Sequence, residues 1–449
     1  MKKWLLIVLI PLLLRPLYAE NGGSRVISLS WAEVVNKTRA DNLQLSIQEQ
    51  DYRHQRLNEW QALADFLPEL SYRFQGQKNL ELPEFVLSTP QGPQRLRIGT
   101  TYNFSHILQL QYPLFTGGAR LANWRIQKNL KKSLRAQLQF QEESTVLSAL
   151  EAYFNLMLSQ ALIEVNLQAY ETARANFNQV EKFYRQGAAS RLDYLRAKSN
   201  LSAALPQLTS ARNARKVAGE NLKFILNIDP QDSLILLDSL QIKDFLQEFS
   251  GMETAQLQEI GLASRSDLQG AAHQRKAVQN QKLVAVSRFL PSVVFTANVQ
   301  HQAQLNESNV APDDFTRAKT AAISLQLPLF EGGARAISYQ QARIQNKQAD
   351  LQYEQFRRSV MLEVESQYLN FRNAAGNLSA LQDATAESRE ALRLSNLTYS
   401  EGIGTQVDVL GTQLNFTTSQ VRLKQGIFDY IISQLRLLKA MGKLNTIWN

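Results

Sequence analysis

One eight-residue phrase occurs twice in this chain, as Pro-Leu-Phe-Thr-Gly-Gly-Ala-Arg at 113–120 and as Pro-Leu-Phe-Glu-Gly-Gly-Ala-Arg at 328–335. The offset between the copies is 328 − 113 = 215, which is close to half of the chain. The register holds without a gap as far as Leu222, whose counterpart is Leu437. Self-similarity at a fixed spacing indicates a duplicated architecture. The sequence therefore predicts two equivalent halves of one body.

A second phrase, Phe-Leu-Pro, occurs at 66–68 and at 289–291, with an offset of 289 − 66 = 223. The two offsets differ by 223 − 215 = 8 residues. The segment between the Phe-Leu-Pro phrase and the eight-residue phrase must therefore be free to vary in length. We expect a first repeat at 20–228 with a helix, two β-strands, a long helix and a return helix. A connecting or equatorial segment at 229–252 leads to the second repeat at 253–449.

The first residues have the pattern of a secretory signal peptide at 1–19. Two lysines precede an apolar run at 4–14, and Ala19 is a small residue at the expected cleavage point, so the mature chain starts at Glu20. An uncleaved membrane anchor is the alternative, but the run is too short for a spanning helix and Pro11 interrupts it. No later stretch resembles a spanning helix.

Composition excludes several classes of protein. With no cysteine in the chain, neither a disulfide nor a lipid-modified cysteine can form. Removal of residues 1–19 lowers the net charge to 9 − 3 = +6, and the basic residues are dispersed, so we expect no nucleic-acid binding. The chain has no glycine-rich phosphate loop with its lysine. The four histidines lack metal-ligand spacing, so we expect no catalytic site, metal or cofactor: His54, His106, His273 and His301.

Apolar and polar residues alternate in two segments of each half. The clearest case is 102–112, where the even positions are mainly aromatic or aliphatic and the odd ones mainly polar. The same alternation occurs after Pro68, at 293–300 and at 323–327. We therefore predict four strands of about ten residues, the length that a tilted strand needs to cross a bilayer. The segments 82–94 and 306–314 have the composition of loops.

The alternative for these strands is an ordinary soluble β-sandwich. Four strands are too few to build one, because we expect most of the chain to be helical. Four strands also cannot close a barrel, so several chains would have to share one.

Two long helices account for much of the rest. Residues 120–184 contain neither proline nor glycine, and their apolar positions step by three and four as in a coiled coil. A helix of this length would extend for about 96 Å. The matching segment 335–399 contains only Gly376. A return helix follows each long one, and Pro206 is expected to kink or split the first of these.

The repeated phrase marks a junction between strand and helix. Its prolines, Pro113 and Pro328, come where we expect each strand to end. Its paired glycines permit the positive φ that a sharp exit requires, and a helix follows at once: Gly117 and Gly118, then Gly332 and Gly333.

Together with a Tyr-x-x-Gly-x-x-x-x-x-Asp-x-Leu turn at 184–195 and again at 399–410, these motifs make the chain similar to TolC-type outer-membrane efflux proteins over nearly its whole mature length. The resemblance implies an α+β membrane protein, a homotrimer in which four strands per chain form a twelve-strand β-barrel in the lipid bilayer. A long α-helical coiled-coil barrel continues it into the periplasm of a Gram-negative cell.

The resemblance also implies a passive exit duct in a tripartite efflux or type I secretion system, and not an enzyme. Its partners would be a periplasmic adaptor (membrane fusion) protein and an inner-membrane pump. The alternative is a periplasmic coiled-coil adaptor or scaffold without a pore, which would lack strands that face lipid.

Three residues take gate roles through this resemblance. Asp408 matches the aspartate that rings the periplasmic entrance and sets cation selectivity; the alternative is that it caps the return helix. Asp193 and Tyr399 match a latch between neighbouring coiled coils, although a tyrosine at a helix end is often only packed. Gly404 and Gly411 replace an arginine and a second aspartate of the family pattern.

The turns at 186–190 and 401–405 match the region that docks the adaptor. Their small residues suit close packing of helix tips: Gly187, Ser190, Gly402, Gly404 and Thr405.

Overall fold

The computed structural model describes residues 25–90, 92–249 and 251–448, so the predicted signal peptide lies outside the described residues. The chain forms two compact units. Unit 1 comprises residues up to Ala40, Ala149–Gln241 and Ala384–Phe428. Unit 2 comprises Asp41–Ser148, Ile242–Asp383 and the residues from Asp429 onward.

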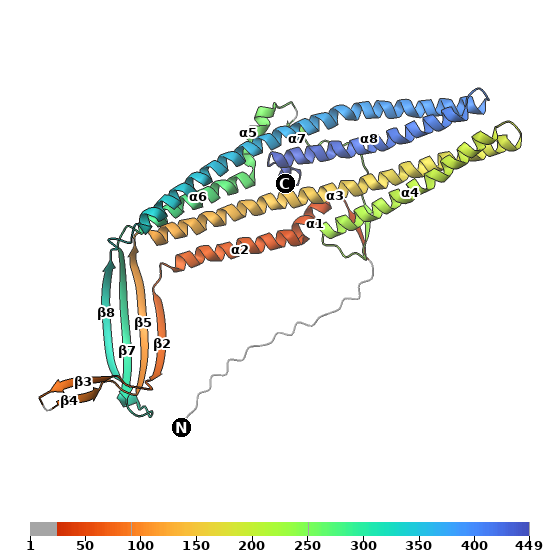
Figure 1. Ribbon diagram of the computed structural model, residues 1–449. Helices are drawn as coiled ribbons and strands as arrows, with labels where there is room; N and C mark the ends of the chain where they lie inside the picture. Colours follow the sequence, from red (N-terminus) through yellow and green to blue (C-terminus); the bar gives the residue numbers. More distant parts are fainter. Residues whose placement is uncertain (1–24, 91, 250, 449) are drawn as a thin grey trace. The chain divides into compact units, whose positions relative to one another are not determined.

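The α-helices of the described chain come in four pairs of equal length (Figure 1). The first helices recur at an offset of 254 − 31 = 223, and the long and return helices recur at an offset of 334 − 119 = 215. These are the same two offsets as those of the sequence phrases. The pairs are α1 (Trp31–Asp41) with α5 (Thr254–Ser264), α2 (Leu43–Ala64) with α6 (Ser266–Ser287), α3 (Ala119–Arg185) with α7 (Ala334–Ser400), and α4 (Arg191–Ile225) with α8 (Gln406–Ala440).

The predicted seam of α3 is buried: Leu147, Leu150, Phe154, Met157 and Ala161 are each at most 7% exposed. Contrary to expectation, α3 also contains a stretch long and apolar enough to cross a membrane, of which 67% is buried within the structure. Burial of this kind is typical of a core helix packed against its neighbours.

Pro206 does not split the return helix. The helix α4 continues through it to Ile225, although a proline inside a helix costs about 3 kcal/mol. Buried side chains on both sides of the proline, Ala197 and Leu208 among them, hold the helix in place. Tertiary packing thus overrides the local signal.

The predicted strands form one antiparallel sheet in unit 2, with the order β2-β5-β7-β8. The bounds are β2 (Glu69–Lys78), β5 (Tyr102–Thr116), β7 (Ser292–Leu305) and β8 (Thr316–Gln326). The outer strands β2 and β8 are each paired on one edge only, and all of their residues are exposed. Figure 1 shows the four strands side by side.

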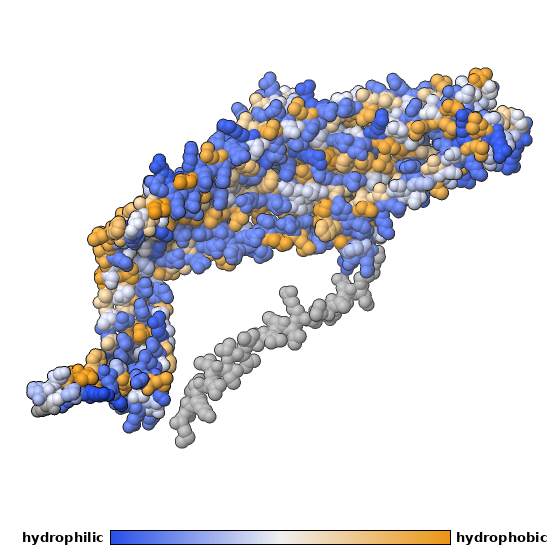
Figure 2. Space-filling model, viewed as in Figure 1, coloured by the Kyte–Doolittle hydropathy of each residue, from blue (hydrophilic) through white to orange (hydrophobic). Residues whose placement is uncertain are grey.

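The register gives this sheet two different faces. One cross-strand row consists of Leu70, Leu110, Ala297 and Ala321, and the next row, on the opposite face, of Ser71, Gln109, Asn298 and Thr320. Because successive side chains of a strand point to opposite faces, the rows define an apolar face and a polar face. Figure 2 shows exposed hydrophobic residues over these strands.

The expectation of a loop at 82–94 is wrong. This segment and the residues after it form a hairpin of β3 (Glu84–Thr89) and β4 (Gly92–Arg97) in unit 2. Its prolines are tolerated because a two-stranded hairpin consists of edge strands, which can lack ladder hydrogen bonds. The pairing places Phe85 opposite Leu96 and Glu84 opposite Arg97.

In unit 1 the connecting segment supplies a strand that the sequence did not reveal. Strand β6 (Ser233–Leu236) pairs in parallel with β1 (Val26–Leu29). Next to it the buried Tyr153 places its hydroxyl 2.8 Å from Asp238 Oδ2 and 3.1 Å from the Leu29 carbonyl oxygen. Burial, and then the hydrogen bond to the carboxylate of Asp238, raise the pKa of Tyr153.

The repeated phrase forms the strand-to-helix junctions. Pro113 does not end its strand: β5 continues to Thr116, with an irregularity between Pro113 and Phe115. Proline suits such a bulge because it has no N–H to donate. Pro328, by contrast, lies beyond the end of β8.

All four glycines of the phrase have positive φ, +61° and +85° at Gly117 and Gly118 and +58° and +82° at Gly332 and Gly333. A Cβ at Gly117 would overlap the Ser287 carbonyl oxygen, whereas nothing lies within 4 Å of the other three.

Within each repeat, the final arginine of the eight-residue phrase contacts the Phe-Leu-Pro phrase. This contact explains why both phrases recur together. The guanidinium of Arg120 lies 5.2 Å from the centre of the Phe66 ring and donates to the Asp65 carbonyl oxygen at 2.9 Å. Arg335 makes the matching contacts with Phe289, at 5.4 Å, and with the Arg288 carbonyl oxygen, at 3.4 Å. Each junction is thus held by a cation–π contact.

Candidate functional site

The candidate site is the pair of helix-to-helix turns in unit 1, α3–α4 and α7–α8. After α3, the N–H of Ala188 donates to the Phe183 carbonyl at 2.8 Å and that of Gly187 to the Tyr184 carbonyl at 3.1 Å. Ile403 and Gly402 make the matching bonds after α7, at 3.0 and 3.1 Å. This is the Schellman pattern, which requires a left-handed residue and therefore favours glycine. The φ angles of Gly187 and Gly402 are +75° and +78°.

Each return helix starts with the same reciprocal cap. The Asp193 N–H donates to Ser190 Oγ at 3.1 Å, and Ser190 Oγ donates to the Asp193 carboxylate at 2.7 Å. Thr405 and Asp408 repeat the arrangement, with the Asp408 N–H 3.2 Å from Thr405 Oγ1. The Thr405 N–H and hydroxyl both donate to Asp408 Oδ2, at 3.2 and 2.5 Å. Within the chain, then, both aspartates serve as helix-capping residues.

The structure brings Asp193 and Tyr399 into one pocket of about 570 Å³. Its wall also includes Phe183, Ser190, Gly402, Gly404 and Thr405. Burial and then the charge of Asp193 raise the pKa of Tyr399. Within the described chain, however, no hydrogen bond joins the two residues, and Tyr399 packs its ring 6.1 Å from that of Phe183.

Gly404 has a steric role that the sequence did not reveal. A Cβ at this position would lie 2.8 Å from Thr398 Oγ1 and 3.0 Å from the Tyr399 nitrogen. The close approach leaves no room for the arginine of the family pattern unless the turn shifts. Gly411 has open space around it, so its replacement of an aspartate has no such steric cause.

A buried amide pair, which no sequence pattern predicted, joins the two hairpins of unit 1. Gln406, 2% exposed, donates through Nε2 to Asn176 Oδ1 at 2.6 Å, and Asn176 is 6% exposed. A second contact connects Asn200 with Gln413 at 3.3 Å. A polar residue at a coiled-coil seam position fixes the register of the helices. In the sequence, Asn176 interrupts the apolar steps of 120–184, and this interruption is the signal that could have revealed the pair.

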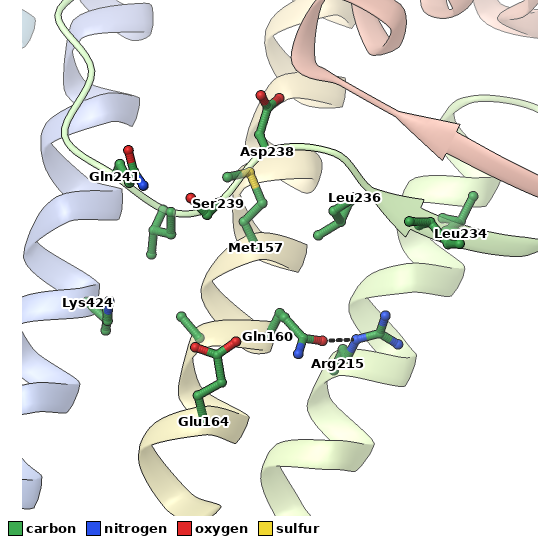
Figure 3. A pocket seen from close by; sticks show the side chains of 13 residues that line it. Met157, Gln160, Glu164, Arg215, Leu234, Leu236, Asp238, Ser239, Gln241 and Lys424 are labelled. Atoms are coloured by element: carbon green, nitrogen blue, oxygen red, sulfur yellow. Dashed lines mark hydrogen bonds between the residues drawn. The ribbon is translucent and has the colours of Figure 1, made fainter. Parts of the chain in front are cut away.

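A second pocket of unit 1, about 570 Å³, lies where the connecting segment passes α3 and α4 (Figure 3). Glu164 belongs to α3 and Lys424 to α8, while Arg215 on α4 donates to Gln160 Oε1 at 2.5 Å. The lining therefore carries charges of both signs. Among the described residues, no group of three or more acidic or histidine side chains is arranged to hold a metal ion.

A match to a known protein family identifies the class of this chain. The family model described as outer membrane efflux protein matches residues 34–227 and 258–443. The chain belongs to the outer membrane efflux protein family. It is therefore an outer-membrane channel protein of the transport type, and the family consists of channels and not of enzymes.

Two named relatives are consistent with this family. The chain is 25% identical to the outer membrane protein TolC of Escherichia coli over 356 residues, which covers 75% of this chain and 69% of TolC. It is 21% identical to the alkaline protease secretion protein AprF of Pseudomonas aeruginosa, with coverage of 75% and 69%.

Among solved structures, the outer-membrane channel OprN has a TM-score of 0.78 at 17% identity and covers 92% of this chain and 89% of its own. The CmeC channel of Campylobacter jejuni has a TM-score of 0.77 at 16% identity, with coverage of 92% and 86%.

Proposed function

We propose that three copies of this chain assemble into one twelve-strand barrel in the outer membrane and act as the exit duct of an efflux or secretion system. The observation that carries this proposal is the four-stranded sheet with two open edges, one apolar face and one polar face. An open edge exposes unpaired N–H and C=O groups, which hydrocarbon cannot satisfy. Pairing β8 of one copy with β2 of the next removes both edges.

The duplicated architecture predicts the register of that contact. Glu69 pairs with Gln111 and Ser292 with Gln326, so β7 and β8 repeat β2 and β5 at offsets of 292 − 69 = 223 and 326 − 111 = 215. The contact between β5 and β7 pairs Gln111 with Thr296. Applying the same offsets, 111 + 215 and 296 − 223, places Gln326 opposite Arg73 of the next copy.

The junction glycines support the same contact. Gly117 has no room for a Cβ because it packs against the carbonyl of Ser287, the last residue of α6. Its counterpart Gly332 has open space in the single chain. The equivalent neighbour, 287 − 223, is Ala64 at the end of α2. In the proposed trimer, Ala64 of the next copy fills the open space beside Gly332.

Cysteine crosslinking tests the proposal directly, because the chain has no cysteine of its own. The paired substitutions Arg73→Cys with Gln326→Cys, and Phe74→Cys with Leu325→Cys, cover two adjacent cross-strand positions. Cross-strand pairs alternate between wide and close spacing, so one of the two brings its sulfurs within disulfide reach. We expect oxidation of membranes to give a covalent trimer on denaturing gels.

The matched control is Leu70→Cys with Gln326→Cys, which is about 10 Å out of register at ~3.3 Å per residue. Crosslinking of the control as efficiently as the paired positions, or no trimer from either pair, would show that the proposed barrel is wrong.

For the turns of unit 1, we propose that they form the periplasmic tip and dock an adaptor protein that serves an inner-membrane pump. The two Schellman turns expose small residues at Gly187 and Gly402, which permit close approach of partner helices. In the trimer, three copies of Asp408 would surround the entrance. Three carboxylates near one axis attract cations and favour cation passage. Capping of α8 and selectivity are compatible roles, because Asp408 is exposed.

A periplasmic adaptor or scaffold without a pore is not supported. The chain belongs to a family of outer-membrane channels, and its sheet has the apolar face that a soluble adaptor has no need for.

A further inference from the structure

Basic and imidazole side chains gather on the apolar face of the sheet, where they are unexpected. His106 lies directly opposite His301, and His301 lies directly opposite Arg317. Lys319, two residues along β8, is on the same face. These four residues, here named the basic cluster, occupy neighbouring positions on three strands. Elsewhere this face carries mainly leucine, valine, alanine and aromatic residues.

The positive charges of Arg317 and Lys319 are not neutralised by any described residue of the chain. In the described part of the chain, neither Arg317 nor Lys319 forms an ion pair, and both are exposed. None of the strand residues on the apolar face is acidic. The Tyr72 hydroxyl lies 2.6 Å from His106 Nδ1, which leaves Nε2 of that ring for another partner. A cluster of this kind favours an anionic ligand.

A hollow of about 370 Å³ adjoins the basic cluster on the same face. Two alanines, Ala297 and Ala321, leave space there, and Leu70, Leu108, Leu110 and Val299 surround it. Lys319 lines the hollow and also belongs to the cluster. An apolar slot beside a group of cations matches the chemistry of a lipid with a charged head group.

We propose that this face binds a phosphorylated lipid of the outer leaflet, with an acyl chain in the hollow and a phosphate group against Arg317, Lys319 and His301. The inference rests on the proposed barrel, in which the apolar face meets lipid. An unpaired Lys or Arg on a lipid-facing strand is destabilising at mid-membrane and less so near the surface. Charge-assisted hydrogen bonds to phosphate offset that cost.

The position of the cluster along the strands agrees with the outer leaflet. Helices α2, α3 and α6 join the sheet at one end, where β2 and β7 begin and β5 finishes. His106 lies four residues from Tyr102, the other end of β5, or about 13 Å along the strand. If the helices occupy the periplasm, the basic cluster lies near the external surface. The stems of Arg317 and Lys319 are long enough to reach the head-group region.

The test measures lipid binding to the delipidated trimer by native mass spectrometry, with diphosphorylated lipid A and phosphatidylcholine as probes. We expect the wild type to prefer lipid A, and Arg317→Gln with Lys319→Gln to weaken lipid A binding about tenfold while binding of phosphatidylcholine is unchanged. Ala321→Leu fills the hollow and should weaken binding of both lipids. Arg73→Gln, on the polar face of the same sheet, is the control.

An unchanged preference for lipid A in the double variant would overturn the inference, as would an equal loss in Arg73→Gln, which would indicate attraction by net charge alone. The cysteine crosslink in the same preparation separates the two proposals. A covalent trimer that shows no preference for lipid A would support the proposed duct and refute the lipid site. Failure of both cysteine pairs to crosslink would refute both proposals.

Discussion

Glu143 on α3 is the side chain whose replacement should most clearly change the pH dependence of stability. It is 6% exposed, and its Oε2 atom has no hydrogen-bond partner among the residues that the structure describes. Burial, and then the negative charges of Asp267 and Glu142, raise the pKa of Glu143 to about 7 from an ordinary value of 4.5. The positive charges of Lys439 and Arg265 offset only part of this effect.

The direction of the pH effect follows from linkage. Because the folded pKa is raised, the folded chain holds a proton that the unfolded chain releases between pH 4.5 and about 7. Stability from this group is therefore complete below pH 4.5 and falls as pH rises to about 7. A shift of 7 − 4.5 = 2.5 units corresponds to about 3 kcal/mol per chain, as an order of magnitude.

The perturbation is Glu143→Gln, which keeps the shape and removes the charge. We expect a gain of about 3 kcal/mol at pH 8 and almost none at pH 4.5. Unfolding of the purified protein in detergent, followed by helical circular dichroism across this pH range, measures the difference. Glu365→Gln, an exposed position on α7, is the control. An equal gain at both pH values, or no gain at pH 8, would refute the reasoning.

Three further outcomes are expected. Asp408→Asn should weaken block of single-channel current by trivalent cations while trimers still form; unchanged block would leave the residue as a cap alone. Tyr399→Phe should raise resting conductance. It should cost no stability, because the Tyr399 hydroxyl has no hydrogen bond within the described chain. Unaltered conductance would refute the latch role of Tyr399. Gly117→Ala should cost more stability than Gly118→Ala, since only Gly117 packs against the Ser287 carbonyl and positive φ costs each about 1 kcal/mol; equal melting temperatures would contradict this.

The candidate site was only partly predictable. The turn motifs located both tips, because glycine at the left-handed position and aspartate three residues after the cap act within a few residues of chain. The amide pair of Asn176 and Gln406 was missed, since its two members are 230 residues apart in sequence. The steric role of Gly404 was missed for a different reason: it depends on how closely the folded turn brings this residue to Thr398 and Tyr399.

The sequence by itself determined the duplication, the long helices and the alternating strands, because periodicity and glycine placement act locally. It also located the junctions, whose φ angles only glycine adopts easily. The tertiary structure decided the features that depend on partners distant in sequence. Packing kept α4 continuous through Pro206, and the register between β5 and β7 placed His106 beside His301. Such contacts join residues that no local pattern connects.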